Sequence, residues 1–199
     1  MSENKKLNEI ADPGPLGLAA FATTTFVLSL INAQLVPATV ADAFLTLGLF
    51  YGGLAQLLAG MWEFKKNNTF GATAFTSYGA FWLALAGMVY CEKLGLINYG
   101  EDGAIGSGIF LLAWTIFTFY MWIGSMAVNK ALLYVFTTLL LTFILLDLEK
   151  FGMLADGVPA GFMGLACAAG AWYASAAGVI NSTHGKVVLP LGSKGNSAH

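Results

Sequence analysis

The stretch AIGSGIFLLAWTIFTFYMWIGSMAV, residues 104–128, decides the fold of this chain. It contains no charged residue, and it exceeds the run of about 20 apolar residues that a helix needs to cross the hydrocarbon core of a bilayer. Its apolar residues are continuous, whereas a strand of a membrane β-barrel alternates apolar and polar residues. Residues 104–128 therefore predict a transmembrane α-helix.

Five further apolar runs flank this stretch along the chain. They cover residues 15–36, 43–62, 71–91, 131–146 and 159–180. The six runs use most of the 199 residues, and the short connections leave no room for a separate soluble domain. The sequence therefore predicts an all-α integral membrane protein, a six transmembrane helix bundle over residues 13–181, with tails at residues 1–12 and 182–199.

The amino-acid composition excludes several classes of protein. Charged residues make up only 10% of the chain, against about 25% in soluble domains. So few charges cannot cover the surface of a soluble domain. The net charge of -2 and the absence of arginine also leave no basic patch for phosphate groups, so nucleic acid is not an expected partner. The expected surroundings are the lipid bilayer.

The lysines set the expected orientation of the bundle. If both termini lie on one side of the membrane, the other side holds only Lys93 and Lys150. The remaining lysines are then Lys5, Lys6, Lys65, Lys66, Lys130, Lys186 and Lys194. Cytoplasmic loops carry the excess of positive residues in membrane proteins. The sequence therefore predicts an N-in/C-in orientation with both tails in the cytoplasm, which agrees with an even number of spans.

Aspartate, glutamate, lysine and histidine are missing from the middle of all six runs. Glu63 and Asp147 lie at the ends of runs, and both histidines lie in the C-terminal tail. Ion pumps and proton relays place acidic or basic residues within the membrane. A membrane protease or metalloenzyme needs a nucleophile–base pair, paired aspartates or histidine and glutamate ligands. The sequence therefore predicts a protein that is not an enzyme and that has no metal site or cofactor.

The polar residues within the runs are neutral. Those that are candidates for lining a solute pathway are Thr24, Thr25, Gln56 and Thr76. A threonine hydroxyl can instead bond to the backbone of its own helix or join two helices, and this interpretation suits any single threonine. The amide of Gln56 cannot be satisfied locally in lipid, so it either joins helices or lines a pathway.

The residues DPGPLGL at 12–18 form a motif rather than a generic apolar run. This stretch resembles the NPAPLGL signature of the acetate uptake transporter family, the succinate–acetate permeases. The blocks FYGGLAQ at 50–56, NTFGATAFTSYG at 68–79 and VVLP at 187–190 support the resemblance. The chain departs from the signature by an aspartate at 12, which still has the helix-capping chemistry of asparagine, and by a glycine at 14. The signature residues of this chain are Asp12, Pro13, Pro15, Leu16, Gly17 and Leu18.

The resemblance implies both a function and a site. Members carry acetate, succinate and related small carboxylates through a pathway in each subunit. They assemble as homohexamers, which implies the same assembly for this chain. We expect this chain to be a multi-pass protein of the prokaryotic cytoplasmic (inner) membrane. The family's apolar constriction maps onto Phe21, Tyr78 and Leu139, and its glutamine maps onto Gln56.

Helix geometry is compatible with this mapping. Phe21, Tyr78 and Leu139 lie on the first, third and fifth runs, which all start at the inner face. With a rise of 1.5 Å per residue, the three side chains lie about 9, 10 and 14 Å beyond Pro15, Gly71 and Lys130, respectively. We expect them to form an apolar collar that strips water from a carboxylate, next to an entry lined by neutral hydroxyl and amide groups. The N-terminus of the first helix also favours an anion on the inner side.

Two alternative functions remain open at the level of sequence. A six-helix channel for a small neutral solute, such as urea or a short amide, would also use an uncharged lining. A membrane scaffold without transport activity would fit the stripes of glycine and alanine on the helices, because small residues let helices pack closely. The sequence also leaves open whether the protein is a channel or a proton-coupled carrier, and whether it prefers acetate or succinate.

Overall fold

The computed structural model describes residues 10–192, apart from the side chain of Ala38, and its regular structure there is helical. Six helices in this part of the chain are long and apolar enough to cross a membrane, so the predicted six-helix fold is confirmed. The elements are α2 (Gly14–Asn32), η1 (Ala38–Val40), α3 (Ala43–Leu49), η2 (Phe50–Ala55), α4 (Gln56–Lys65), α5 (Thr69–Lys93), η3 (Gly100–Asp102), α6 (Gly103–Ser125), α7 (Lys130–Lys150) and α8 (Val158–His184). Residues 1–9 and 193–199 of the predicted tails lie outside the described residues.

The second span is one continuous helix made of α3, η2 and α4. Its middle segment, Phe50–Ala55, has π-helical hydrogen bonding, which widens the helix locally and is common at functional sites. Gly52 lies here against Thr24 of α2, and a Cβ atom at Gly53 would lie 2.7 Å from the Leu83 side chain of α5. The glycines therefore let the widened segment pack closely between two other helices.

The observed helix ends differ from the predicted ends by a few residues. α2 ends at Asn32 rather than at residue 36, because Gln34 has a left-handed backbone with φ of 56°. α7 continues to Lys150 rather than residue 146, and α8 continues to His184, which falls within the predicted C-terminal tail. Hydropathy marks the apolar part of a span, whereas the backbone stays helical into the polar residues that follow.

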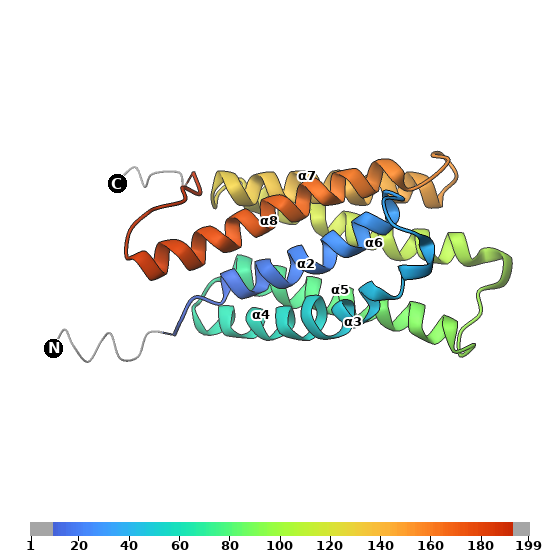
Figure 1. Cartoon of the computed structure of the whole chain (residues 1–199), viewed down its shortest axis with the longest axis horizontal. Coiled ribbons are helices and arrows are strands. Elements are labelled where there is room, and N and C mark those ends of the chain that lie inside the picture. The colour runs from blue at the N-terminus through green and yellow to red at the C-terminus, as the bar shows by residue number, and fades with distance from the viewer. Residues whose placement is uncertain (1–9, 193–199) are drawn as a thin grey trace.

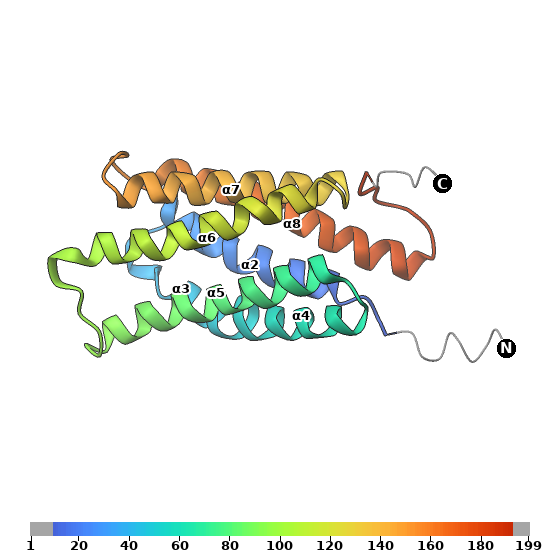
Figure 2. The same ribbon diagram turned by 180° about the vertical axis from the view of Figure 1, so that it is seen from behind.

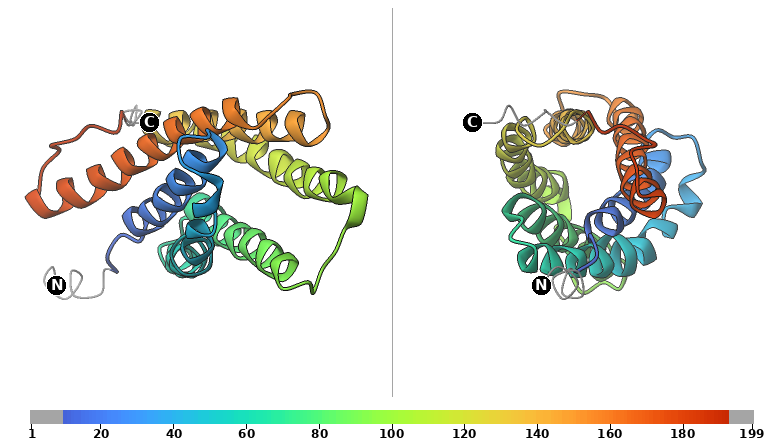
Figure 3. Two further views of the ribbon diagram at one scale, coloured as in Figure 1. Left: turned by 45° about the vertical axis from the view of Figure 1, so that its right-hand side comes forward. Right: turned by 90° about the vertical axis from the view of Figure 1, so that its left-hand side faces the viewer.

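The helices form a closed ring. α2 packs against α8, α8 against α7, α7 against α6, and α5 against the second span, which returns to α2. Figure 1 shows that α2 begins and α8 ends at the same end of the bundle. Seen from that end, the helices lie around a common axis (Figure 3, right). This ring places parts of α2, α4, α5, α7 and α8 around a shared interior.

The crossing of α2 and α8 depends on small residues of α8. Gly161 and Gly164 pack directly against the backbone and side chains near the end of α2. A Cβ atom at Gly178 would lie 2.6 Å from Pro15 at the start of α2. Where lipid gives no hydrophobic driving force between helices, such close approach supplies the van der Waals contact that holds them together.

The segment after α8 docks back onto the bundle. The side chain of Asn181 accepts hydrogen bonds from the backbone of Val188 and Leu189 at 2.7 and 2.9 Å. The hydroxyl of Tyr173 donates to the carbonyl of Pro190 at 2.8 Å. This docking brings Leu191 to the wall of the interior cavity described below.

Candidate functional site

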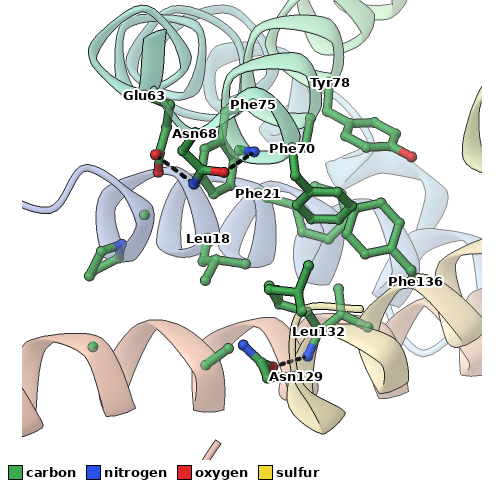
Figure 4. A pocket seen from close by; sticks show the side chains of 18 of the residues that line it. Leu18, Phe21, Glu63, Asn68, Phe70, Phe75, Tyr78, Asn129, Leu132 and Phe136 are labelled. Atoms are coloured by element: carbon green, nitrogen blue, oxygen red, sulfur yellow. Dashed lines mark hydrogen bonds between the residues drawn. The ribbon is translucent and has the colours of Figure 1, made fainter. Parts of the chain in front are cut away.

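A cavity of about 190 Å³ lies inside the ring at the end where α2 begins. Figure 4 shows side chains from α2, α4, α5 and α7 around it. It reaches from Asp12 and Asn129 near the helix starts to Tyr78 and Leu139 in the interior. The space is enough for several water molecules or a small organic anion.

Three helices begin at the mouth of this cavity. α2, α5 and α7 start at the same end of the bundle (Figure 2), and Gly14, Gly71 and Leu132 from their first turns line the cavity. The side chain of Asn68 accepts a hydrogen bond from the backbone N–H of Gly71 at 3.1 Å, and that of Asn129 accepts one from Leu132 at 2.8 Å. Helix N-termini carry partial positive charge. These helix starts therefore favour an anion at the mouth, whereas the acidic side chains of Asp12 and Glu63 also line the cavity and no lysine does so in the described part of the chain.

The inner end of the cavity is apolar and aromatic. Phe21, Tyr78 and Leu139 all line it, with exposed fractions of 5% or less. The rings of Phe21 and Tyr78 lie 6.0 Å apart between centroids. Phe136 completes this group, because its ring lies 6.2 Å from that of Tyr78 and 5.3 Å from that of Phe70. We call Phe21, Tyr78, Phe136 and Leu139 the collar.

Tyr78 is held in the collar by α6. Its hydroxyl and that of Thr118 share a hydrogen bond of 2.8 Å, and both side chains are almost fully buried. The ring also packs edge-on against Phe117 at 5.2 Å. Large aromatic side chains lie between α5 and α6. The Tyr78–Thr118 bond joins the two helices across them and fixes where the phenol ring lies relative to the cavity.

Replacing Thr118 by valine should lower the free energy of unfolding by about 1–2 kcal/mol, because it leaves the buried phenol of Tyr78 without a partner. Valine has almost the same shape, so packing is kept. Thermal unfolding in detergent measures the change. Thr183→Val is the matched control, since the Thr183 hydroxyl is exposed and bonds only to the Val179 carbonyl of its own helix. Equal unfolding temperatures for the two variants would contradict the assigned role of Thr118.

Gln56 is the polar residue of the predicted lining that reaches the cavity. It is 1% exposed and lines the cavity from α4, next to the π-helical segment. Its Oε1 atom is buried without a hydrogen-bond partner among the described residues. An amide in this position can donate a hydrogen bond to a carboxylate oxygen.

The three predicted threonines are not among the residues that line the cavity. The hydroxyl of Thr24 donates to the carbonyl of Ala20, four residues earlier, at 3.0 Å. Thr76 packs against Gly60, where α5 crosses α4. Thr25 is 6% exposed, and its hydroxyl is buried without a partner in the described structure. Thr24 and Thr76 therefore lie at helix contacts. The Thr24 hydroxyl bonds to its own helix, as threonine hydroxyls commonly do, whereas the Thr76 hydroxyl is buried without a partner in the described structure.

The signature motif builds one wall of the mouth. Asp12 lies just before α2, and its Oδ1 atom accepts a hydrogen bond from the backbone N–H of Gly14 at 3.2 Å. The same atom forms an ion pair with Lys66 at 3.4 Å. The carbonyl of Pro15 accepts a hydrogen bond from Ser175 of α8 at 2.7 Å. The aspartate thus keeps a capping role, although Pro13 is the residue at the helix boundary.

The rest of the motif is explained by packing. A Cβ atom at Gly17 would lie 2.6 Å from the ring of Phe75, so only glycine fits there. Leu18 lines the cavity, whereas Leu16 is 46% exposed on the outer side of the helix. Pro15 and Gly17 therefore set how α2 lies against α8 and α5, and Leu18 faces the interior.

Beyond the collar, aromatic side chains fill the bundle. The ring of Phe81 lies 5.1 Å from Trp114, 5.5 Å from Phe143 and 5.8 Å from Phe110. Further along, Asp147 is 8% exposed and accepts a hydrogen bond of 2.5 Å from the Thr115 hydroxyl. The cavity therefore faces one end of the bundle, and packed aromatic rings separate it from the other end.

Residues 2–193 match the family model described as the GPR1/FUN34/yaaH family. The chain belongs to this family. The resemblance inferred from the motif at residues 12–18 is thereby confirmed. Together with the six spanning helices, membership in the GPR1/FUN34/yaaH family makes it a multi-pass membrane protein.

Several relatives of this chain carry transport names. The chain is 40% identical to the succinate-acetate/proton symporter SatP of Escherichia coli, over 92% of this chain and 96% of that protein. It is 39% identical to acetate permease A of Emericella nidulans, over 92% of this chain and 66% of that protein. A solved structure of the bacterial acetate channel SatP matches with a TM-score of 0.87 and 40% identity, covering 92% of this chain and all of that one.

Proposed function

We propose that this protein is a membrane channel or transporter for acetate, succinate and related small carboxylates, and that the cavity and its collar form the solute pathway. The observation that carries the proposal is the cavity itself. It has helix N-termini at its mouth, Gln56 in its wall and the collar at its end, in a chain that closely matches an acetate channel in structure.

The electrostatics of the cavity suit passage rather than tight binding. Helix N-termini and an amide donor favour an anion by modest amounts, about 0.3–1 kcal/mol for each helix end. Lys66 is already paired with Asp12. No lysine is among the lining residues in the described part of the chain, so a carboxylate meets no full positive charge in the cavity. It is therefore held weakly and can leave again, which conduction requires. The collar then selects for solutes that can shed water along an apolar surface.

The proposal extends to the orientation, assembly and location of the protein. We propose an N-in/C-in orientation, a homohexameric assembly and a location in the prokaryotic cytoplasmic membrane, with no enzymatic activity. Lysines support the orientation, because they lie at helix ends or within two residues of them on the side where α2 begins, namely Lys65, Lys66, Lys130 and Lys186. Apolar residues on the outer face of α6, such as Ile109, Ile116 and Ile123, support contact with lipid or with another subunit.

Competition for labelled acetate in proteoliposomes tests the function. We expect unlabelled acetate and succinate to lower the exchange of labelled acetate through the purified protein, and urea to leave it unchanged, because urea lacks the charge that the helix N-termini attract. Liposomes without protein give the background from direct permeation. Competition by urea alone would favour the neutral-solute channel, and no exchange above background would favour a scaffold.

A further inference from the structure

Glu63 is a buried carboxyl group inside the cavity. It lies in the last full turn of α4, is 2% exposed and lines the cavity together with Asn68. Figure 4 shows its side chain beside Asn68, whose Nδ2 atom donates a hydrogen bond of 2.8 Å to Oε2 of Glu63. This carboxyl group has no part in the proposed attraction of anions, and an ionised form would oppose it.

Two glycines leave the space that this carboxyl group occupies. A Cβ atom at Gly71, in the first turn of α5, would lie 2.8 Å from the carboxyl carbon of Glu63. One at Gly14, in the first turn of α2, would lie 3.5 Å from Oε1. The carboxyl group therefore lies between the starts of two helices that line the cavity mouth. Oε1 lies on the Gly14 side, and the side-chain hydrogen bond of Glu63 in the described structure is the one that Asn68 donates to Oε2.

The charged groups that face Glu63 do not neutralise it. Asp12, before α2, and Lys66, after α4, are the charged neighbours that act on it. These two are paired with each other at 3.4 Å. The first turns of α2 and α5 contribute no acidic residue, and Asn68 offers a neutral amide. In the part of the chain that the structure describes, Glu63 has one hydrogen bond and no ion pair.

A second carboxylate cannot occupy this cavity beside an ionised Glu63 without strong repulsion, because like charges a few ångströms apart disfavour each other. One proton between the two groups reverses the effect. An O–H group on one carboxyl then donates to the oxygen of the other, which is a short, charge-assisted hydrogen bond. Two carboxyl groups that share a site behave in this way, with a single proton between them.

We propose that Glu63 is the proton site of the carboxylate cavity, so that a carboxylate occupies the cavity only together with one proton held between it and Glu63. The inference rests on the proposed function. In each cycle the cavity binds one carboxylate and one proton and then releases the same carboxylate and proton. No covalent bond to carbon forms or breaks. Occupancy of the cavity is thereby linked to pH, independently of how the aromatic core opens.

The test measures protons directly on the purified protein in detergent. Acetate is added to a weakly buffered solution at a pH where it is fully ionised, and the proton uptake at saturation is recorded. We expect the wild type to take up one proton per acetate bound and Glu63→Gln to take up none. The half-saturating acetate concentration of the wild type should rise by up to about tenfold per pH unit, as linkage to one proton requires. The same concentration should not change with pH in Glu63→Gln.

Asp147→Asn is the matched control, because Asp147 is also a buried carboxyl but is not among the residues that line the cavity. It should retain both the proton uptake and the pH dependence.

Glutamine at 63 can still accept the hydrogen bond from Asn68, and Glu63→Asp, which keeps a carboxyl group, should restore proton uptake. Acetate binding by the wild type without proton uptake, or equal uptake by Glu63→Gln, would overturn the inference while leaving the proposed function intact. No acetate binding by the wild type would instead refute the proposed function.

Discussion

Replacing Phe21 by alanine is expected to raise acetate flux about tenfold and to weaken the selection between small and larger carboxylates. A tenfold change corresponds to about 1.4 kcal/mol in the barrier. Phe21 supplies one wall of the collar from α2, and its ring faces that of Tyr78 at 6.0 Å. Without this ring a carboxylate keeps more of its hydration while it passes Tyr78 and Leu139, so the cost of dehydration falls.

The matched control is Phe26→Ala on the same helix. Phe26 packs against Trp172 of α8 with ring centroids 5.0 Å apart and is not among the residues that line the cavity. Each change removes one phenyl ring from α2. A change of flux that comes only from weaker packing of α2 would therefore appear in both variants. Labelled acetate and labelled succinate uptake into proteoliposomes gives the flux and its ratio. Wild-type flux and an unchanged ratio in Phe21→Ala would remove the collar from the proposed pathway.

The six helices could be predicted because each span is a long apolar run, and a bilayer demands about 20 such residues. Their ends could not be predicted as well. α7 continues past Leu146 through Asp147 to Lys150, because a helix that has already formed satisfies its own backbone whatever side chains follow. The π-helical segment at Phe50–Ala55 also left no hydropathy signal, since its residues are apolar like those of a regular helix.

The residues of the cavity wall were predicted through the family resemblance, which maps an apolar constriction onto Phe21, Tyr78 and Leu139 and a glutamine onto Gln56. Helix depth is compatible with that mapping, and the structure brings all four residues to the same cavity. Phe136 was missed, although it lies three residues before Leu139 and therefore on the same face of α7. Periodicity alone does not distinguish a residue that lines a cavity from one that packs in the core.

Glu63 illustrates a different limit. The predicted second span stops at residue 62, which puts Glu63 at the polar end of a helix and suggests a solvated side chain. In the structure α4 continues to Lys65, and the start of α5 folds back over the glutamate. Its burial depends on two glycines of other helices. Gly14 of α2 is far from Glu63 in the sequence, and Gly71 lies in the first turn of α5. Such a contact is a tertiary property that no local pattern carries.

Replacing Gly161 by alanine is expected to lower the free energy of unfolding by about 3 kcal/mol, the upper part of the range for overpacking a tight contact. A Cβ atom at Gly161 of α8 would lie 2.6 Å from the Cα atom of Ala33 and 2.7 Å from the carbonyl carbon of Asn32. These are backbone atoms at the end of α2, so no side chain can rotate away. The strain is relieved only if the end of α2 moves away from α8.

Thermal unfolding in detergent, followed by tryptophan fluorescence, should show a fall of roughly 10 °C for Gly161→Ala, given about 2–4 °C per kcal/mol in a chain of this size. Gly87→Ala is the control, because it lies within α5 and a Cβ atom there meets nothing within 4 Å. Alanine favours a helix over glycine by up to about 1 kcal/mol, so Gly87→Ala should be as stable as the wild type or slightly more so.

α2 also carries Phe21 and the signature motif, so a displaced α2 should alter acetate exchange in Gly161→Ala below its unfolding temperature. Wild-type stability in Gly161→Ala would show that α2 and α8 can separate without loss, and that their close crossing does not hold the cavity wall in place.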